Sequence, residues 1–81
     1  MSLVIENETW TLTDRLRKSR LLAGLEQAEI AAALGVARNT VSNWEHGRSE
    51  PPASAFVRWS RATGVPLEWL AEGVSDYGSE G

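Results

Sequence analysis

Residues 27–48, QAEIAAALGVARNTVSNWEHGR, contain two short helical patterns separated by Gly35. The first pattern is made mostly of alanine and aliphatic residues, and the second has one apolar edge and one polar edge. Glycine adopts the left-handed backbone that ends a helix in little space. The sequence therefore predicts two tightly joined helices, at about 27–34 and 38–46. A pair of this kind is the unit with which many proteins read the major groove of DNA.

The second pattern separates its side chains by polarity. At 100° per residue, Val41 and Trp44 form an apolar seam. One face of the remaining surface carries Arg38, Asn39, Ser42, Asn43 and His46, while Glu45 lies near the apolar seam. That polar face has no carboxylate, which is what a groove lined by acceptors and flanked by phosphates requires. An ordinary solvated face usually mixes Glu with Lys, so we interpret this face as one that reads DNA.

Small residues in the first pattern favour close packing. Ala28, Ala31 and Ala32 leave little side chain between the helix axis and its neighbour, so we expect a steep crossing at short distance. Val36 is expected to cover the corner after Gly35.

The segment resembles the helix-turn-helix of the lambda repressor-like family, which includes phage Cro and CI repressors and XRE-like bacterial regulators. The matching positions are Gln27, Ala31, Leu34-Gly35-Val36 and the run from Thr40 to Gly47 (TVSNWEHG). The resemblance covers about residues 12–73. It implies an all-α fold, a compact five-helix lambda repressor-like DNA-binding domain.

Three further helices are expected around this motif. One is expected to begin after Thr11 or Thr13 as its N-cap and to run to about residue 23. A second runs to about 63 with Pro52 in its first turn, and a short third helix follows Pro66. Its expected inward side chains are Leu67, Trp69 and Leu70, and those of the second are Phe56 and Trp59. Residues 1–11 are expected to form an irregular N-terminal arm and residues 74–81 a flexible acidic tail.

Composition limits the classes of function. The 81 residues suit a single domain, without cysteine for a disulfide or a thiolate metal site. The net charge is −3, yet the window from Arg15 to Arg61 holds all eight basic residues and only four acidic ones. Local charge matters most, because salt screens beyond about 10 Å. No signal peptide or apolar span is visible, so we expect a cytoplasmic protein without a membrane partner.

The resemblance implies roles for individual residues of the polar face. Its base readers correspond to Arg38, Asn39, Ser42 and Asn43. Arg38 suits the O6 and N7 atoms of guanine, and Asn39 suits the N6 and N7 atoms of adenine.

Contacts to the DNA backbone are expected elsewhere. Gln27 begins a helix, where free N–H groups favour an anion, and the family uses a glutamine there for a phosphate. The other candidates for the backbone are Thr40, His46, Arg48, Arg17 and Lys18. Arg58 and Arg61 are interpreted as solvated surface residues.

Arg20 continues the line of Leu12 and Leu16 along the buried side of its helix. A buried arginine needs a partner, because an unpaired buried charge is very costly. The resemblance implies a buried ion pair between Arg20 and Glu45. The alternative is that the Arg20 side chain extends to solvent.

Two positions depart from the family pattern. Ala37 stands where a Ser or Thr often caps the second helix of the motif, at a cost of about 1 kcal/mol if no other group replaces the cap. Glu26 precedes the first helix of the motif, where its carboxylate suits the helix dipole but repels a nearby phosphate.

These features predict a sequence-specific DNA-binding transcriptional regulator, most simply a small phage or prophage repressor of the Cro/CI type. It is expected to bind a double-stranded operator as a homodimer, without the extra dimerisation or self-cleavage domain of larger phage repressors. The alternative is a protein-interaction module or antitoxin of the same fold.

An enzyme is not expected. His46 is the single histidine and has neither a cysteine nor an acidic cluster to work with. The sequence also gives no reason to expect a cofactor, a bound metal or a small-molecule ligand.

Overall fold

The computed structural model describes residues 10–73, so the arm expected at 1–11, apart from its last two residues, and the tail expected at 74–81 lie outside the described residues. The described part contains helices and no strand. The helices are α2 (Leu12–Leu22), α3 (Gln27–Leu34), α4 (Arg38–Glu45), α5 (Ala53–Thr63) and α6 (Leu67–Glu72). The expected all-α, five-helix fold is confirmed.

The N-terminus of α2 is fixed by a reciprocal cap. The Asp14 amide donates to Thr11 Oγ1 at 3.3 Å, and the Thr11 amide donates to Asp14 Oδ2 at 3.1 Å. Two amides that have no partner within the helix are thereby satisfied. Thr11, rather than Thr13, is therefore the N-cap.

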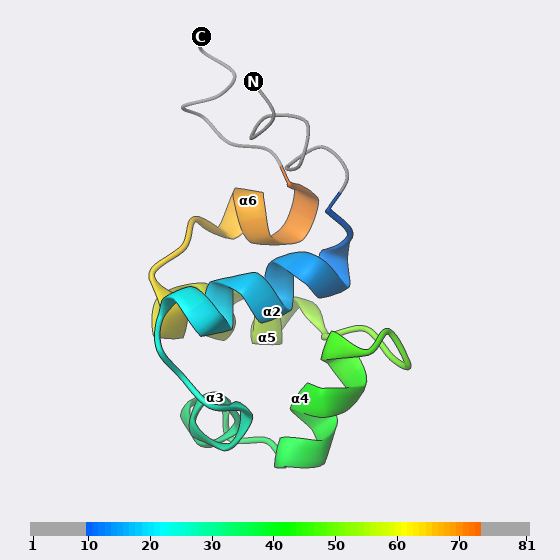
Figure 1. Cartoon of the computed structure of the whole chain (residues 1–81), viewed down its shortest axis with the longest axis vertical. Coiled ribbons are helices and arrows are strands. Elements are labelled where there is room, and N and C mark those ends of the chain that lie inside the picture. The colour runs from blue at the N-terminus through cyan, green and yellow to red at the C-terminus, as the bar shows by residue number, and fades with distance from the viewer. Residues whose placement is uncertain (1–9, 74–81) are drawn as a thin grey trace, which may run out of the picture.

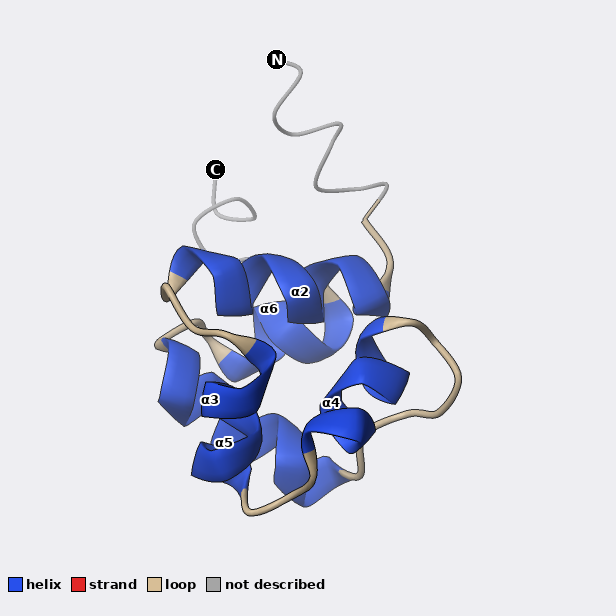
Figure 2. Cartoon of the chain, turned by 60° about the horizontal axis from the view of Figure 1, so that its bottom comes forward, coloured by secondary structure: helices blue, strands red, loops and turns tan. Residues whose placement is uncertain are grey.

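Helix α2 crosses the middle of the molecule, with α6 on one side and α3 and α4 on the other (Figure 1). It contacts α4, α5 and α6, while α3 packs against both α4 and α5. Figure 2 shows α3 beside α5, and α4 packs against α3 as well. The two helices of the motif are thus supported from behind by α2 and α5.

Each helix contributes one apolar side chain that is completely inaccessible to solvent. These residues are Leu16, Ile30, Val41, Trp59 and Leu70, all 0% exposed. Burying a side chain of this size stabilises the fold by about 1.5–3 kcal/mol. The Trp59 indole Nε1 donates to Ser19 Oγ at 2.9 Å, and Ser19 Oγ donates to the Leu16 carbonyl at 2.9 Å. The polar atoms inside this core are therefore hydrogen-bonded.

The turn between α3 and α4 depends on Gly35, whose φ is +75°. The Val36 amide donates to the Ala31 carbonyl at 3.0 Å, and the Gly35 amide donates to the Ala32 carbonyl at 3.2 Å. These two bonds form a Schellman motif, which ends a helix within one residue. Figure 1 looks along α3 while α4 runs close to the plane of the picture, so the two helices cross steeply.

The structure corrects several expectations. Ala28 and Ala32 are exposed, so the close packing of α3 rests on Ala31 alone among the three alanines. The buried stripe of α3 passes through Ile30, Ala31 and Leu34, about a quarter of a turn or more away from the other two. Helix α4 ends at Glu45, and His46 is its C-cap.

At the other end of the molecule, Leu67 is 40% exposed, so its expected inward position is wrong. Helix α6 makes fewer than two turns, and α2 bonds to its second turn, beyond Leu67. Pro52 is the N-cap of α5 rather than a residue of its first turn. Within residues 10–73, no helix combines the length and the apolar character needed to cross a membrane.

Candidate DNA interface

The outer face of α4 is open to solvent. Arg38 and Asn39 are exposed and Thr40, Ser42 and Asn43 are partly exposed, whereas Val41 and Trp44 are buried on the other side. The N-terminal end of α3, which carries Gln27, and the loop after α4 lie on either side of α4 (Figure 2). The four residues expected to read bases therefore lie on one helix, outside the core, with their polar groups accessible.

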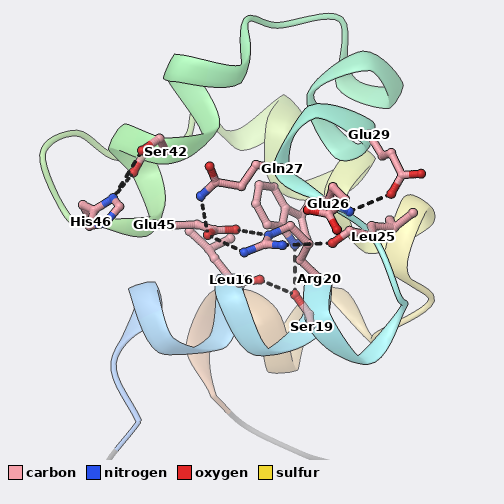
Figure 3. A network of polar contacts seen from close by, with 11 residues as sticks. Leu16, Ser19, Arg20, Leu25, Glu26, Gln27, Glu29, Ser42, Glu45 and His46 are labelled. Carbon is pink, nitrogen blue, oxygen red and sulfur yellow. Dashed lines mark hydrogen bonds and ion pairs between the residues drawn. The ribbon is translucent and has the colours of Figure 1, made fainter.

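Helix α4 is held to α2 by a buried ion pair (Figure 3). Arg20 Nε donates to Glu45 Oε2 at 2.7 Å, and Arg20 Nη2 donates to Glu45 Oε1 at 3.0 Å. The two side chains are only 9% and 2% exposed. The remaining guanidinium nitrogen, Nη1, donates to the Leu25 carbonyl at 2.9 Å. This is the fork-like geometry in which arginine and carboxylate bind most strongly.

The Arg20 guanidinium stays charged in this site. Its hydrogen bond to Glu45 raises the pKa of Arg20, against the lowering effect of burial. Because an arginine side chain is always protonated in proteins, this raised pKa keeps the guanidinium charged.

Gln27 joins the same network from α3. Its Nε2 donates to Glu45 Oε1 at 2.9 Å (Figure 3). An amide nitrogen has two protons, so one remains for an acceptor outside the protein. The residue expected to bind a phosphate is thus already oriented by the buried carboxylate.

Polar side chains at the C-terminal end of α4 bind one another. His46 Nδ1 lies 2.8 Å from the Ser42 carbonyl oxygen and 3.3 Å from Ser42 Oγ. Arg48 Nη1 donates to Asn43 Oδ1 at 3.4 Å. The backbone closes with a second Schellman motif, in which the Arg48 amide donates to the Asn43 carbonyl at 2.9 Å and Gly47 has a φ of +76°.

The N-terminal ends of the two motif helices differ. Ala37 gives α4 no side-chain cap, although its carbonyl oxygen accepts from the Thr40 amide at 3.0 Å. At α3, Glu29 Oε1 accepts a hydrogen bond from the Glu26 amide at 2.7 Å. A carboxylate therefore occupies the start of α3, beside Gln27.

The two basic candidates on α2 are separated by the fold. Arg17 is exposed. Lys18 Nζ lies 5.7 Å from the ring centroid of Trp10, and this ring packs edge-on against Trp69 of α6 at 6.1 Å. Because α6 and α4 lie on opposite sides of α2, Lys18 is directed away from the face of α4 (Figure 1).

Arg15 has a structural role that the sequence did not reveal. It is 8% exposed, and it donates from Nε to the Leu70 carbonyl at 3.0 Å and from Nη2 to the Ala71 carbonyl at 3.2 Å. A third bond runs from Nη1 to the Trp10 carbonyl at 3.1 Å. Burial lowers the pKa of Arg15 and the charge of Asp14 raises it. No periodicity or motif marks this residue, because its partners lie in a helix far along the chain.

Arg58 is also more than a solvated side chain. Its Nη1 donates to the Leu34 carbonyl at 3.2 Å, at the C-terminal end of α3. A cation at this end also suits the helix dipole. Among residues 10–73, no group of three His, Cys, Asp or Glu side chains is placed to bind a metal.

Comparisons with known proteins match the chain over most of its described length. A helix-turn-helix family profile matches residues 16–70. The chain is 32% identical over 61 residues to YonR, an SPbeta prophage-derived uncharacterized HTH-type transcriptional regulator of Bacillus subtilis, which covers 75% of the chain and 56% of YonR. It is 32% identical over 69 residues to the HTH-type transcriptional regulator DdrOP3 of Deinococcus deserti, covering 85% of the chain and 54% of DdrOP3.

A third relative, an uncharacterized HTH-type transcriptional regulator of Haemophilus influenzae, is 39% identical over 46 residues, which is 57% of the chain and 19% of that protein. The chain therefore matches little more than half of the length of these relatives, or less. The profile match includes both helices of the motif and the α2 and α5 residues that form their core. The chain belongs to the lambda repressor-like helix-turn-helix family.

Proposed function

We propose that this protein is a sequence-specific DNA-binding transcriptional regulator that inserts α4 into the major groove. The observation that carries the proposal is the acid-free outer face of α4, on which Arg38 and Asn39 are exposed while Val41 and Trp44 anchor the helix in the core. The three relatives described above are all named as HTH-type transcriptional regulators, which supports the proposal.

The first half of α4 faces the bases in this proposal. Arg38 forms a bidentate hydrogen bond with guanine, and Asn39 forms one with adenine. Each contact contributes about 1–3 kcal/mol of discrimination against the wrong base. Ser42 and Asn43 lie one turn further along the same helix and read the neighbouring positions.

The phosphates are held by Thr40 of α4 and by residues outside this helix, namely Gln27, His46, Arg48 and Arg17. Such contacts fix the register of the protein on the duplex without carrying sequence information. The bonds of Glu45 to Arg20 and Gln27 keep α4 in a set position relative to the phosphate-binding end of α3. Base contacts and backbone contacts are thereby oriented before DNA arrives, which reduces the entropy lost on binding.

More specifically, we propose that the protein is a small phage or prophage repressor of the Cro/CI type that acts in the cytoplasm. The match to the prophage-derived YonR supports this origin. The excess positive charge around the motif is modest, which favours binding by two subunits. A symmetric homodimer would place its half-sites about 34 Å apart on a palindromic operator.

The test is selection of bound duplexes from a random pool, followed by mobility-shift titration at increasing salt. We expect an enriched palindromic sequence, with an affinity that falls linearly on a log–log scale by about 0.9 per phosphate contacted. Arg61→Ala serves as the matched control, because this exposed arginine lies on α5 and should leave binding unchanged. Absence of any preferred sequence at every salt concentration would contradict the proposal and favour a protein-interaction module or antitoxin.

A further inference from the structure

His46 is the only histidine of the chain, and its ring is held in one orientation. The Ser42 carbonyl oxygen, 2.8 Å from Nδ1, is an acceptor only, so Nδ1 must carry the proton. Nδ1 is also 3.3 Å from Ser42 Oγ. Within residues 10–73, Nε2 has no hydrogen-bond partner, and the ring is exposed at the end of α4. The free nitrogen is therefore the one that meets whatever binds this face.

The charged groups close to His46 along the chain are all engaged or exposed. Glu45 precedes it, but the Glu45 carboxylate is only 2% exposed and binds Arg20 and Gln27. Arg48 binds Asn43. Glu50 is exposed in the following loop.

Helix α2 packs against the same end of α4, since a Cβ atom at Gly47 would lie 3.5 Å from Thr13 Cγ2. Of the charged groups of α2, Asp14 accepts the Thr11 amide and Arg15 and Lys18 are directed to the α6 side. Arg17 is exposed.

Helix α3, which also packs against α4, carries Glu29, which binds the Glu26 amide. Helix α5 contacts α4 through the Trp44–Trp59 pair, and its charged side chains are Arg58, which binds the Leu34 carbonyl, and the exposed Arg61. In the part of the chain that the structure describes, the one ion pair joins Arg20 to Glu45, and none involves His46. No carboxylate therefore competes for a proton placed on the imidazole.

We infer that His46 is a proton-dependent contact to the DNA backbone, so that protonation of Nε2 sets the affinity of the α4 face for a phosphate. This inference rests on the proposed function. When Nε2 carries a proton, it donates a charge-assisted hydrogen bond to a phosphate oxygen. When it does not, the same atom presents a lone pair, which repels that oxygen.

The direction of the pH effect follows by linkage. An imidazole ordinarily titrates near pH 6.5, and a bound phosphate favours the protonated form. Affinity for DNA should therefore rise as the pH falls through this region, level off at lower pH, and lose the contribution of His46 at higher pH. Carboxylates ordinarily remain ionised down to about pH 5, and the α-amino group, which begins to lose its proton near pH 7.5, is the same in the wild type and in a His46 variant.

The experiment measures binding by fluorescence anisotropy at pH 5.5 and pH 7.5, at matched ionic strengths. Two probes are used: a duplex selected by the protein from a random pool and a duplex of random sequence. For the wild type we expect roughly three- to tenfold tighter binding at pH 5.5, and a salt dependence steeper by about 0.9 on the log–log scale, which is one extra phosphate contact.

Two variants assign the effect to the ring. His46→Gln keeps a polar side chain without a titrating charge and should bind equally at both pH values, with one salt slope. His46→Lys carries a permanent charge and should bind at pH 7.5 as tightly as the wild type does at pH 5.5. Arg48→Gln is the matched control: it should bind more weakly but keep the pH dependence.

The outcomes separate the two proposals. Sequence-specific binding without pH dependence, or pH dependence that persists in His46→Gln, overturns the inference and leaves the proposed function intact. If selection enriches no duplex and the random duplex does not bind at either pH, while thermal unfolding shows a folded protein, the proposed function fails and the inference fails with it.

Discussion

Glu45 is a single residue that joins three helices through hydrogen bonds. Its Oε1 accepts from Arg20 Nη2 and Gln27 Nε2, and its Oε2 accepts from Arg20 Nε. One carboxylate thus connects α2, α3 and α4. Because the group is buried, its charge is tolerable only while these donors remain in place.

Replacing Arg20 by alanine should destabilise the protein by about 3–5 kcal/mol, since Glu45 would keep only the Gln27 amide as a partner. Chemical denaturation measures this loss. The double variant Arg20→Met with Glu45→Met should lose less than the two single changes together, because it leaves no unpaired charge. An Arg20→Ala protein as stable as the wild type would show that the pair contributes nothing.

Replacing Arg38 by alanine should lower the affinity for the selected operator by about 1–3 kcal/mol, relax the preference at one base pair and leave the melting temperature nearly unchanged. The reason is that Arg38 is exposed and forms no hydrogen bond or ion pair with another described residue. Titration of single-base operator variants, together with thermal unfolding, checks both parts. A large fall in melting temperature would instead make Arg38 a structural residue.

At the scale of the helix, α4 depends on tertiary support. It has eight residues, too few for independent stability, and its N-terminus has no side-chain cap. Its stability comes from Val41 and Trp44 in the core and from the closed C-terminal end. An uncapped N-terminus on a proposed DNA-binding face leaves amide groups free for a phosphate.

Two substitutions at Ala37 separate capping from DNA binding. Ala37→Ser and Ala37→Asp should each stabilise the fold by about 1 kcal/mol by capping α4. Ala37→Asp should also weaken DNA binding severalfold, because it places a carboxylate at the N-terminus of α4, next to the base-reading residue Arg38. Ala37→Ser should cost little affinity. Denaturation and anisotropy titrations on both variants test this, and equal DNA affinities for the two would argue against a phosphate or base edge near Ala37.

Considered as a whole, the molecule has the two motif helices on one side of α2 and α6 on the other, and α6 packs against both α2 and α5 (Figure 1). Helix α6 has only six residues and is attached by Leu70, by the Trp10–Trp69 contact and by the Arg15 guanidinium. Arg15 binds the last carbonyls of α6, where a cation also complements the helix dipole.

Replacing Arg15 by alanine should therefore release α6 before the rest of the fold. We expect a loss of about 2–3 kcal/mol, because buried carbonyls lose a charged donor. Hydrogen exchange should show lost protection at the Leu70 and Gly73 amides while α3 and α4 remain protected. Arg15→Lys should rescue little, since an ammonium lacks the planar fork. Uniform loss of protection across all helices would contradict the idea that Arg15 acts on α6.

The sequence by itself determined the helices and the motif. Periodicity placed α3 at its observed bounds, and Gly35 and Gly47 marked two helix ends, because these signals belong to consecutive residues. The acid-free face of α4 could be read in the same way. Errors arose where position within a helix does not decide exposure, as for Ala28, Ala32 and Leu67, whose surroundings depend on which neighbour packs there.

Only the tertiary structure decided which polar groups meet. Arg15 binds carbonyls 55 and 56 residues away, Trp59 binds a serine 40 residues away, and Gln27 binds a glutamate 18 residues away. Lys18 and Arg17 are neighbours in the chain, yet Lys18 is directed toward the aromatic pair beside α6. A hydrogen bond depends on distance, angle and exclusion of water, and for residues on different helices these quantities are set by how the helices pack, which no local pattern contains.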